Sequence, residues 1–439
     1  MTAARAAVRR RVRWGFQHGV VGLAVRRAAR KGDLQATSIV DPGHRENPYP
    51  LYEKVRARGD LVPGRLGHVT VSHDVVNAVL KSDDFRAGPD DAAMPGPLAK
   101  LVRWSRDPKA LGPIDPPSLL VVEPPDHTKY RRLVSRVFTA RAVEALRIRV
   151  QAIADGLLDE LERTPEVDLV EAYCSQLPVT VITEILGVRP EDREKVLGFG
   201  RDGAPSLDVG LTWKQFQSVD IAVRGFQEWL GGHLERLRRE PGDDLLSQLV
   251  TLEDEGQRLD ETELRAVAGL VLAAGFETTV NLLGSGTVLL LEHPDQLALL
   301  REQPSLWPNA VDEILRYEAP VQVTARFALR EVELAGRVVR PGGLVVTMLG
   351  GANRDPKVFA DPNRFDVTRE NAREHLSFSG GRHFCLGAAL ARLEGEVGLR
   401  TLLDRLPDLE LAPGRTRRTT RVLRGWETLP VRTNRVLVG

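Results

Sequence analysis

The sequence predicts a mainly α-helical protein with a small β region (α+β), organised as a single large domain around one long central helix. The 439 residues are 42% hydrophobic and 28% charged, which is the usual balance of a globular protein. Helical periodicity covers most of 124–253 and continues through 260–292 and 386–406. Alternation with a period of two is confined to short stretches, as expected for small peripheral sheets. The chain contains no internal repeat and no low-complexity tract.

The first 32 residues differ in charge from the rest of the chain. They contain nine basic side chains and no acidic one, whereas the remaining 52 basic and 60 acidic side chains carry a net charge of −8. We therefore divide the chain into a basic N-terminal arm at 1–32, which we expect to be flexible, and a main domain at 33–439.

The arm lacks the features of a secretory signal. Such a signal needs an apolar core of roughly 7–15 residues, and the longest apolar run here, Val20–Val25, has six residues including a glycine. No later stretch reaches the ~18 uninterrupted apolar residues of a membrane span. Two interpretations stay open. The arm is either a basic amphipathic helix in weak contact with an anionic membrane surface, or a frayed or loosely docked extension, which we favour.

Residues 48–122 precede the main helical part. The pattern predicts a helix at 51–58, a hairpin around 66–71 and a short helix at 74–80. Residues 83–122 are rich in proline, glycine and aspartate, which predicts a long loop with at most short helical pieces. Loops of that length inside a compact protein are usually lids or pocket walls.

The central helix is predicted from a capping signal followed by a long apolar repeat. Asp260 and Glu263 have the spacing of a capping box, and apolar residues then recur at helical spacing as far as His293-Pro294. About 33 residues at 1.5 Å each make a helix of ~50 Å. Such a helix is long enough to cross the whole molecule.

The C-terminal third mixes strands with one more helix. Residues 321–346 are strand-like with turns at 335–336 and 341–343, a helix is expected at 386–406, and 420–438 alternates as edge strands do.

The two cysteines, Cys174 and Cys385, are too few for a disulfide framework or a multi-cysteine metal site, and they fit a reducing, cytoplasmic compartment. Cys385 follows two glycines and precedes a helical pattern, so its thiolate would lie at a helix N-terminus, where the pKa of a thiol is lowered. Three roles fit the residues alone: a metal ligand, a nucleophile with His383 as base, or a buried structural thiol. We interpret Cys174 as a core residue.

The segment around Cys385 closely resembles the haem-ligand loop of the cytochrome P-450 superfamily. Phe378, Gly381, Cys385 and Gly387 fill the fixed positions of that motif, and His383 fills its usual basic position. The resemblance implies the fold of bacterial, actinobacterial-like members, a haem b cofactor, and Cys385 as the axial thiolate on the haem iron. A thiolate ligand favours O–O cleavage. The resemblance spans about 40–435.

Two further motifs are similar to those of the family. Glu313 and Arg316 can pair across one helical turn and resemble the Glu-x-x-Arg helix of the family. Together with Arg364 in the segment 361–365, this resemblance implies structural support for the cysteine loop.

Ala274-Gly275-Phe276-Glu277-Thr278 resembles the oxygen-binding segment. There Ala274 and Gly275 would border the cofactor. Glu277 and Thr278 are the catalytic candidates, because an acid–alcohol pair can deliver protons and a helical threonine can bond the carbonyl four residues earlier.

The resemblance also supplies partners for the two haem propionates. His127 and Arg131 lie one helical turn apart, and with Arg326 and His383 they match the family's propionate contacts. Arginine pairs well with carboxylates.

The function implied is that of a haem-thiolate monooxygenase, an oxidoreductase that inserts one oxygen atom from O2 into a small molecule. No flavin fingerprint or iron–sulfur cysteine set is present, so electrons would come from a separate ferredoxin and ferredoxin reductase. The pocket walls implied by the resemblance are mostly apolar, which predicts a lipophilic substrate: the 83–122 loop, Leu270, Ala273, Ala274, Gln322, Val323, Thr324, Val422 and Leu423.

Two alternatives are kept. A peroxide-using haem-thiolate enzyme would not need the acid–alcohol pair, and a non-catalytic haem or gas sensor would bind haem without turnover. A nucleic-acid partner is not expected, because the arm has few aromatic residues and the rest of the chain is acidic.

Overall fold

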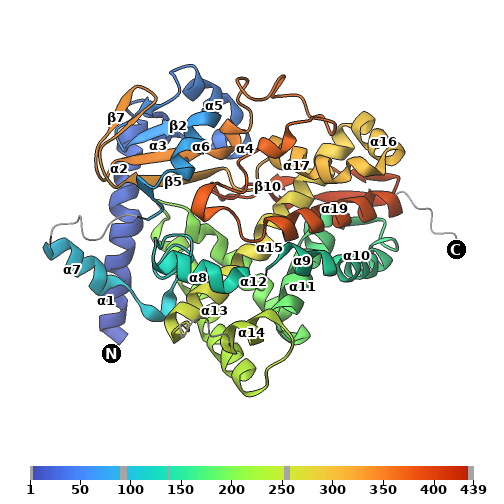
Figure 1. Ribbon diagram of the computed structural model, residues 1–439, viewed down its shortest axis with the longest axis horizontal. Helices are drawn as coiled ribbons and strands as arrows, with labels where there is room; N and C mark the ends of the chain where they lie inside the picture. Colours follow the sequence, from blue (N-terminus) through green and yellow to red (C-terminus); the bar gives the residue numbers. More distant parts are fainter. Residues whose placement is uncertain (1–2, 89–95, 137, 252–257, 434–439) are drawn as a thin grey trace.

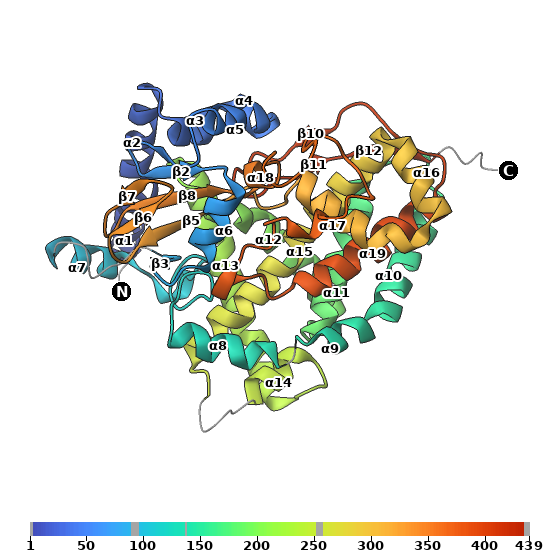
Figure 2. The same ribbon diagram turned by 45° about the horizontal axis from the view of Figure 1, so that its top comes forward.

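The structure is a computed structural model that describes residues 3–88, 96–136, 138–251 and 258–433. A sheet-containing part formed largely by the N-terminal third lies beside a larger helical part, and the long helix α15 runs through the middle (Figures 1 and 2). This arrangement confirms the predicted mainly α-helical fold with a small β region.

The helices of the N-terminal third surround the larger sheet. They are α1 (Ala3–Trp14), which continues through a π-helical turn at Gly15–Gly19 into α2 (Val20–Ala29), then α3 (Leu34–Val40), α4 (Pro42–Glu46), α5 (Tyr49–Arg56), α6 (His73–Lys81) and α7 (Gly96–Ser105). The predicted 83–122 loop thus contains a ten-residue helix, α7. Residues 89–95 of that loop lie outside the described residues.

The remaining helices form the larger part of the molecule, except for α18, which packs against α5 and α6. They are α8 (Asp126–Ser135), α9 (Ala140–Ala145), α10 (Arg147–Leu161), α11 (Gln176–Ile185), α12 (Arg193–Gly203), α13 (Trp213–Arg239), α14 (Leu245–Thr251), α15 (Glu261–Glu292), α16 (Pro294–Glu302), α17 (Trp307–Tyr317), α18 (Leu349–Ala352) and α19 (Ala388–Arg405).

The strands form one five-stranded sheet and three smaller ones. The five-stranded sheet has the order β1-β2-β8-β5-β3, and only its β2–β8 pair is parallel. Its strands are β1 (Val62–Pro63), β2 (His68–Thr70), β3 (Phe85–Arg86), β5 (Val323–Ala328) and β8 (Leu344–Met348). The smaller sheets comprise β4 (Glu166–Asp168), β12 (Pro430–Thr433) and β9 (Leu409–Leu411); β6 (Val332–Leu334) and β7 (Arg337–Val339); β10 (Thr416–Arg417) and β11 (Trp426–Thr428).

Helix α15 begins and ends where the sequence predicts. The Asp260 carboxylate accepts from the Thr262 and Glu263 N–H groups at 2.8 Å, and the Glu263 carboxylate accepts from the Asp260 N–H. The helix is long and apolar enough to cross a membrane, but 72% of its most apolar window is buried inside the protein. It packs against α11, α13, α17 and α19, so core burial accounts for its composition.

The N-terminal arm is helical and docked on α13, whereas we favoured a frayed or loosely docked extension. Arg13 is buried and forms an ion pair with the fully buried side chain of Asp220. The Trp14 indole donates to the Leu211 carbonyl at 3.0 Å, and Arg11 stacks over the Trp213 ring at 4.3 Å. The sequence shows the charge of the arm, but its counter-charge is about 200 residues away along the chain.

Candidate functional site

The segment 378–387 forms a tight loop that presents Cys385 just before α19. The Cys385 N–H donates to the Phe378 carbonyl at 2.9 Å, and the Phe384 N–H donates to the Gly381 carbonyl at 3.1 Å. Phe378 is buried and Phe384 is 42% exposed. The loop therefore has an inner face packed on the protein and an outer face toward solvent.

Gly381 fixes the loop against α6. Its φ of +62° lies in the left-handed region, and a Cβ there would meet the Leu80 carbonyl oxygen at 2.4 Å. Only glycine combines that backbone conformation with so close an approach. This explains the motif glycine in terms of packing.

The pKa of the Cys385 thiol is raised, which is opposite to our expectation. Cys385 is exposed, but desolvation by the neighbouring protein atoms outweighs the Gly387 N–H and the positive charges of Arg131 and Arg392, which all lower the pKa. A metal cation would deprotonate the thiol on binding. Cys174 is fully buried with a raised pKa, as expected for a core residue.

Glu313 and Arg316 form a fully buried, bidentate ion pair at 2.6 and 2.8 Å. The second arginine on Glu313 is Arg369, at 3.2 Å, and not the predicted Arg364. The Arg364 side chain is 65% exposed, and only its backbone carbonyl takes part, by accepting from Arg316 and Arg369. Both arginines lie in one irregular segment, so no helical or strand spacing in the sequence distinguishes them.

A second buried acid beside this pair was missed from the sequence. Asp312 accepts from His375 at 3.2 Å and from Arg392 at 2.7 Å. Burial would raise the pKa of Asp312, but these two groups lower it overall. The Arg392 guanidinium also stacks over the Phe378 ring at 4.6 Å, so Asp312 supports the cysteine loop through Arg392. A lone acid adjacent to the Glu-x-x-Arg motif gives no sequence signal for this role.

On α15, Thr278 has the predicted back-bond, since its hydroxyl donates to the Ala274 carbonyl at 3.2 Å. Ala274 is exposed although it lies in the middle of this core helix. Gly275 has a packing role, because a Cβ there would meet Ile182 of α11 at 2.9 Å. The glycine thus allows α11 to approach α15 closely.

Glu277 is buried and forms an ion pair with Arg418, the residue that follows β10. The Arg418 guanidinium also donates to the Trp426 carbonyl at 3.1 Å. No local pattern indicates this partner, because the two residues are 141 positions apart.

Three of the predicted propionate-binding residues lie together. The His127 and His383 rings are 4.7 Å apart, and Arg131 donates to the Phe384 carbonyl at 2.7 Å. Burial and the nearby positive charges lower the pKa of His127 to about 4. Helix α8 and the cysteine loop thus meet at this cluster.

Arg326 and His383 show that the cluster suits an added anion. Arg326 is buried, hydrogen-bonds to Thr324 and Ala325 of its own strand, and has no carboxylate oxygen within 4.0 Å among the described residues. The buried His383 Nε2 has no hydrogen-bond partner, and its nearest carboxylate, Glu123, is 3.6 Å away. Buried polar groups without partners are costly, so these residues fit the carboxylates of a haem.

Besides the 83–122 loop, the predicted substrate wall comes from three segments. Leu270, Ala273 and Val422 are partly exposed, and Leu423 is buried and bridges to Val321. On β5, Val323 and Thr324 are also partly exposed.

Gln322 differs, because its amide is already used in the fold. It accepts from the Tyr52 hydroxyl at 2.8 Å and donates to the Ala319 carbonyl at 2.7 Å.

Comparison with known proteins agrees with this geometry. The cytochrome P450 family profile matches residues 207–423. The chain is 55% identical to "Putative cytochrome P450 140" of Mycobacterium bovis over 96% of this chain and 97% of that protein. It is 42% identical to 6-deoxyerythronolide B hydroxylase of Saccharopolyspora erythraea, over 88% and 95% respectively.

A similar solved structure is that of myxobacterial CYP267B1 in complex with myristic acid, with a TM-score of 0.81, 34% identity, and coverage of 91% of this chain and 100% of that one. The family resemblance read from the cysteine loop is thereby confirmed. The chain belongs to the cytochrome P450 family, whose cofactor is haem, and is a haem-thiolate monooxygenase.

Proposed function

We propose that this monooxygenase hydroxylates a lipophilic small molecule with one oxygen atom of O2, using electrons from a ferredoxin and its reductase. Haem, when bound, would carry the O2 chemistry and the one-electron chemistry. The protein supplies binding, orientation and protons. The cytoplasm is the proposed compartment.

The observation that carries the proposal is the support given to Cys385. Asp312 holds Arg392, whose guanidinium stacks on Phe378 of the loop, and the adjacent Glu313 is paired with Arg316 and Arg369. Removing one partner of a buried pair typically costs about 3–5 kcal/mol. Such support is expected where the position of one sulfur atom must be fixed.

In this proposal Cys385 ligates the haem iron, and His127, Arg131, Arg326 and His383 hold the two propionates. His383 Nε2, which makes no hydrogen bond and lies 3.6 Å from Glu123, and the buried Arg326 support that assignment.

Thr278 is proposed to hold a proton-bearing hydroxyl at the exposed stretch of α15 around Ala274, and Glu277 to supply protons to it. The ion pair with Arg418 holds the Glu277 side chain in place.

Two features support the proposed partners. A solved relative carries myristic acid, and the walls proposed for the substrate are mostly apolar, which suits a lipophilic substrate. Arg132, Arg136 and Arg400 are exposed, and Arg136 directly follows α8. Cations of this kind would speed the association of an acidic ferredoxin.

The spectrum of the ferrous–CO complex tests the assignment. Wild-type protein and the Cys174→Ser control should show the far-red-shifted Soret band of a thiolate ligand, and Cys385→Ser should lose it. A wild-type band typical of imidazole ligation would overturn the proposal.

A further inference from the structure

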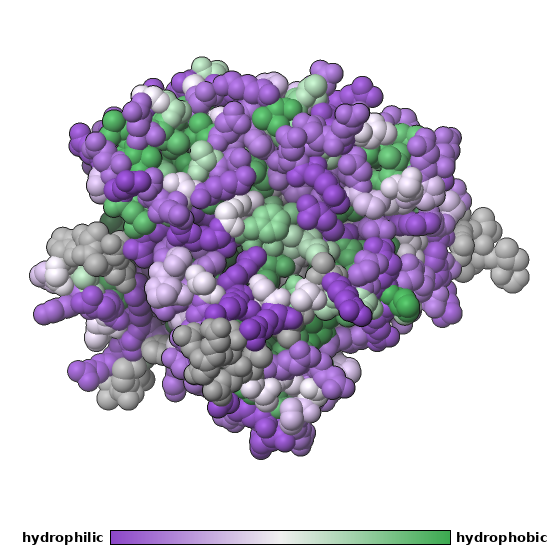
Figure 3. Space-filling model, viewed as in Figure 1, coloured by the Kyte–Doolittle hydropathy of each residue, from purple (hydrophilic) through white to green (hydrophobic). Residues whose placement is uncertain are grey.

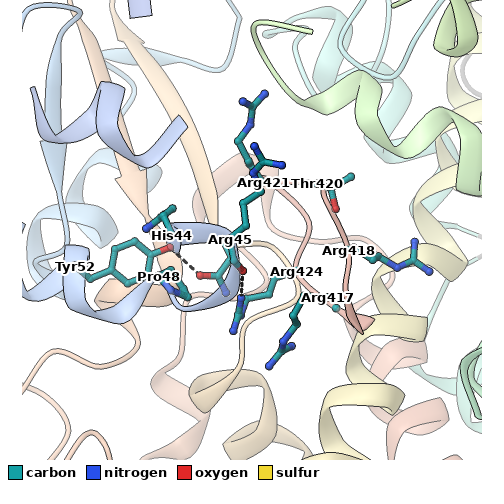
Figure 4. Close-up of a pocket in the computed structure, with 11 residues that line it drawn as sticks. His44, Arg45, Pro48, Tyr52, Arg417, Arg418, Thr420, Arg421 and Arg424 are labelled. Atoms are coloured by element: carbon teal, nitrogen blue, oxygen red, sulfur yellow. Dashed lines mark hydrogen bonds between the residues drawn. The ribbon is translucent and has the colours of Figure 1, made fainter. Parts of the chain in front are cut away.

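A pocket rich in arginine lies between the N-terminal segment around α4 and the C-terminal segment 417–425 (Figure 4). Except for Gln322, the side chains come from two parts of the chain that are about 370 residues apart. The lining residues are His44, Arg45, Pro48, Tyr52, Gln322, Arg417, Arg418, Thr420, Arg421, Arg424 and Gly425.

The pocket has more positive than negative charge. Five guanidinium groups line it, but only three carboxylates pair with them, those of Glu277, Glu318 and Asp208. Glu46 and Glu427 are exposed and attract these arginines only at longer range. An excess of buried cations is unfavourable unless an anion compensates it.

Two of the arginines have structural roles. Arg424 pairs with Glu318 and donates to the Arg45 carbonyl at 2.6 Å and the Glu46 carbonyl at 3.1 Å. Arg421 donates to the Ile39 carbonyl at 2.8 Å. These contacts join the N-terminal segment to segment 417–425 and build the pocket walls.

Arg417 and Arg45 differ, because they have donors without partners. The buried Nη1 of Arg417 and the buried Nε of Arg45 make no hydrogen bond, and neither does the buried Nδ1 of His44. Arg417 stacks over the Trp426 ring at 3.6 Å, and the nearest oxygen of Glu318 is 3.8 Å from its guanidinium. Stacking therefore fixes the position of Arg417, and its Nη1 group stays without a hydrogen-bond partner.

We propose that this pocket binds an oxyanion, the carboxylate or phosphate group of a small molecule, with Arg417 and Arg45 as its recognition residues. Guanidinium groups suit such oxyanions because they offer paired donors. Figure 4 shows His44 and Tyr52 on one side of the pocket and Arg418 and Thr420 on the other, with Arg45, Arg417, Arg421 and Arg424 between them.

Segment 417–425 also connects the pocket to the catalytic candidates. Arg418 lines the pocket and pairs with Glu277 of α15. Val422, in the predicted substrate wall, accepts from the Gln322 N–H at 2.9 Å. An oxyanion held here would therefore order the substrate wall, or be the charged end of the substrate itself. This consequence rests on the proposed function, whereas anion binding does not.

Calorimetric titration of the haem-loaded protein with inorganic phosphate, in a phosphate-free buffer of low ionic strength, tests the site. We expect wild type to bind phosphate and to show a higher Tm in its presence. Arg417→Gln and Arg45→Gln should each weaken binding about tenfold or more. Arg415→Gln is the matched control, because Arg415 lies over the same Trp426 ring at 5.3 Å but is exposed and paired with Glu292.

A second arm separates the two sources of the oxyanion. Dodecanoate and dodecanol share one chain and differ in the anionic group, and their binding is followed by the haem spin-state shift. Tighter binding of dodecanoate that is lost in Arg417→Gln assigns the site to a substrate head group, and phosphate binding alone assigns it to a free oxyanion. Arg45→Gln serves if Arg417→Gln does not fold.

Equal phosphate and dodecanoate binding by wild type and both variants, or no binding of either anion, would overturn the proposal. The CO spectrum, which reports the thiolate assignment, is unaffected by that result.

Discussion

Arg418 and Glu277 form a buried ion pair that joins the segment after β10 to the middle of α15. Both side chains are more than nine-tenths buried, so each depends on the other for compensation of its charge. The acid of the predicted acid–alcohol pair is thus held by a residue that also lines the arginine-rich pocket.

Breaking this pair should destabilise the protein, and removing both charges should not. Arg418→Gln leaves a buried carboxylate without its partner, and we expect a loss of about 3–5 kcal/mol in the free energy of unfolding. The double variant Glu277→Gln/Arg418→Gln should recover most of that loss. Denaturant unfolding of all four proteins gives the coupling energy. Additive effects of the two substitutions would show that the pair is not coupled.

Thr278→Ala should separate electron consumption from product formation. The variant lacks the hydroxyl that donates to the Ala274 carbonyl, and correctly positioned proton transfer is typically worth ~100-fold or more. Product per electron should fall while peroxide rises. Thr278→Ser keeps the hydroxyl and is therefore the control. A substitution of the adjacent Thr279 is less suitable, because Thr279 is buried. Equal coupling in the alanine variant and wild type would exclude this role for Thr278.

Arg369→Ala and Arg364→Ala should differ sharply. Arg369 pairs with the buried Glu313, whereas the Arg364 side chain is exposed. We expect Arg369→Ala to lose about 3 kcal/mol or more and much of its haem, and Arg364→Ala to stay within about 0.5 kcal/mol of wild type. Haem content per protein and the unfolding midpoint are the measurements. The reverse order would contradict the assignment.

Glu394 of α19 should make stability depend on pH. It is fully buried, and neither carboxylate oxygen has a hydrogen-bond partner. Burial raises its pKa well above the ordinary value. The folded protein therefore keeps this proton to higher pH than the unfolded chain does, and its free energy of unfolding falls as pH rises above about 4.3.

Glu394→Gln removes this dependence, so its stability relative to wild type should grow from pH 5 to pH 8, by at most about 1.4 kcal/mol per pH unit. The control is Glu396→Gln on the same helix, because Glu396 is paired with Arg147 at 2.9 Å. A difference between Glu394→Gln and wild type that is constant with pH would show that Glu394 does not titrate abnormally.

Arg13→Gln should weaken the docking of the N-terminal arm. It removes one partner of the fully buried Asp220, which keeps Arg224 at 2.8 Å. We expect a loss of about 1–3 kcal/mol, measured by thermal unfolding. The exposed Arg5 provides the control, Arg5→Gln. A Tm equal to wild type would support the loosely docked arm that the sequence suggested.

Local patterns predicted much of the fold. The capping box at Asp260 and the stop at His293-Pro294 define α15 to within a residue, because both signals act over one helical turn. The alternation in 321–346 likewise predicts β5 to β8. These elements depend on neighbours in the chain, so their residue types carry the information.

Long-range pairing could not be predicted in this way. Arg369 was missed in favour of Arg364, and nothing in the sequence links Arg418 to Glu277 or Arg13 to Asp220. Each of these contacts joins segments whose relative positions depend on the whole fold. The same holds for the raised pKa of Cys385, because the helix terminus was visible in the sequence but the desolvation by neighbouring protein atoms was not.

The two faces of the ten-residue cysteine loop have different surroundings. Its inner face is held by Gly381 against the Leu80 carbonyl and by the stacking of Arg392 on Phe378, while Phe384 is exposed. The view in Figure 3 is mostly hydrophilic with a smaller apolar area near its centre. Substitutions meant to change the proposed contact with an electron donor therefore belong at the exposed positions of the loop, such as Phe384, and not at its packed positions. An unchanged CO band would report that the sulfur has stayed in place.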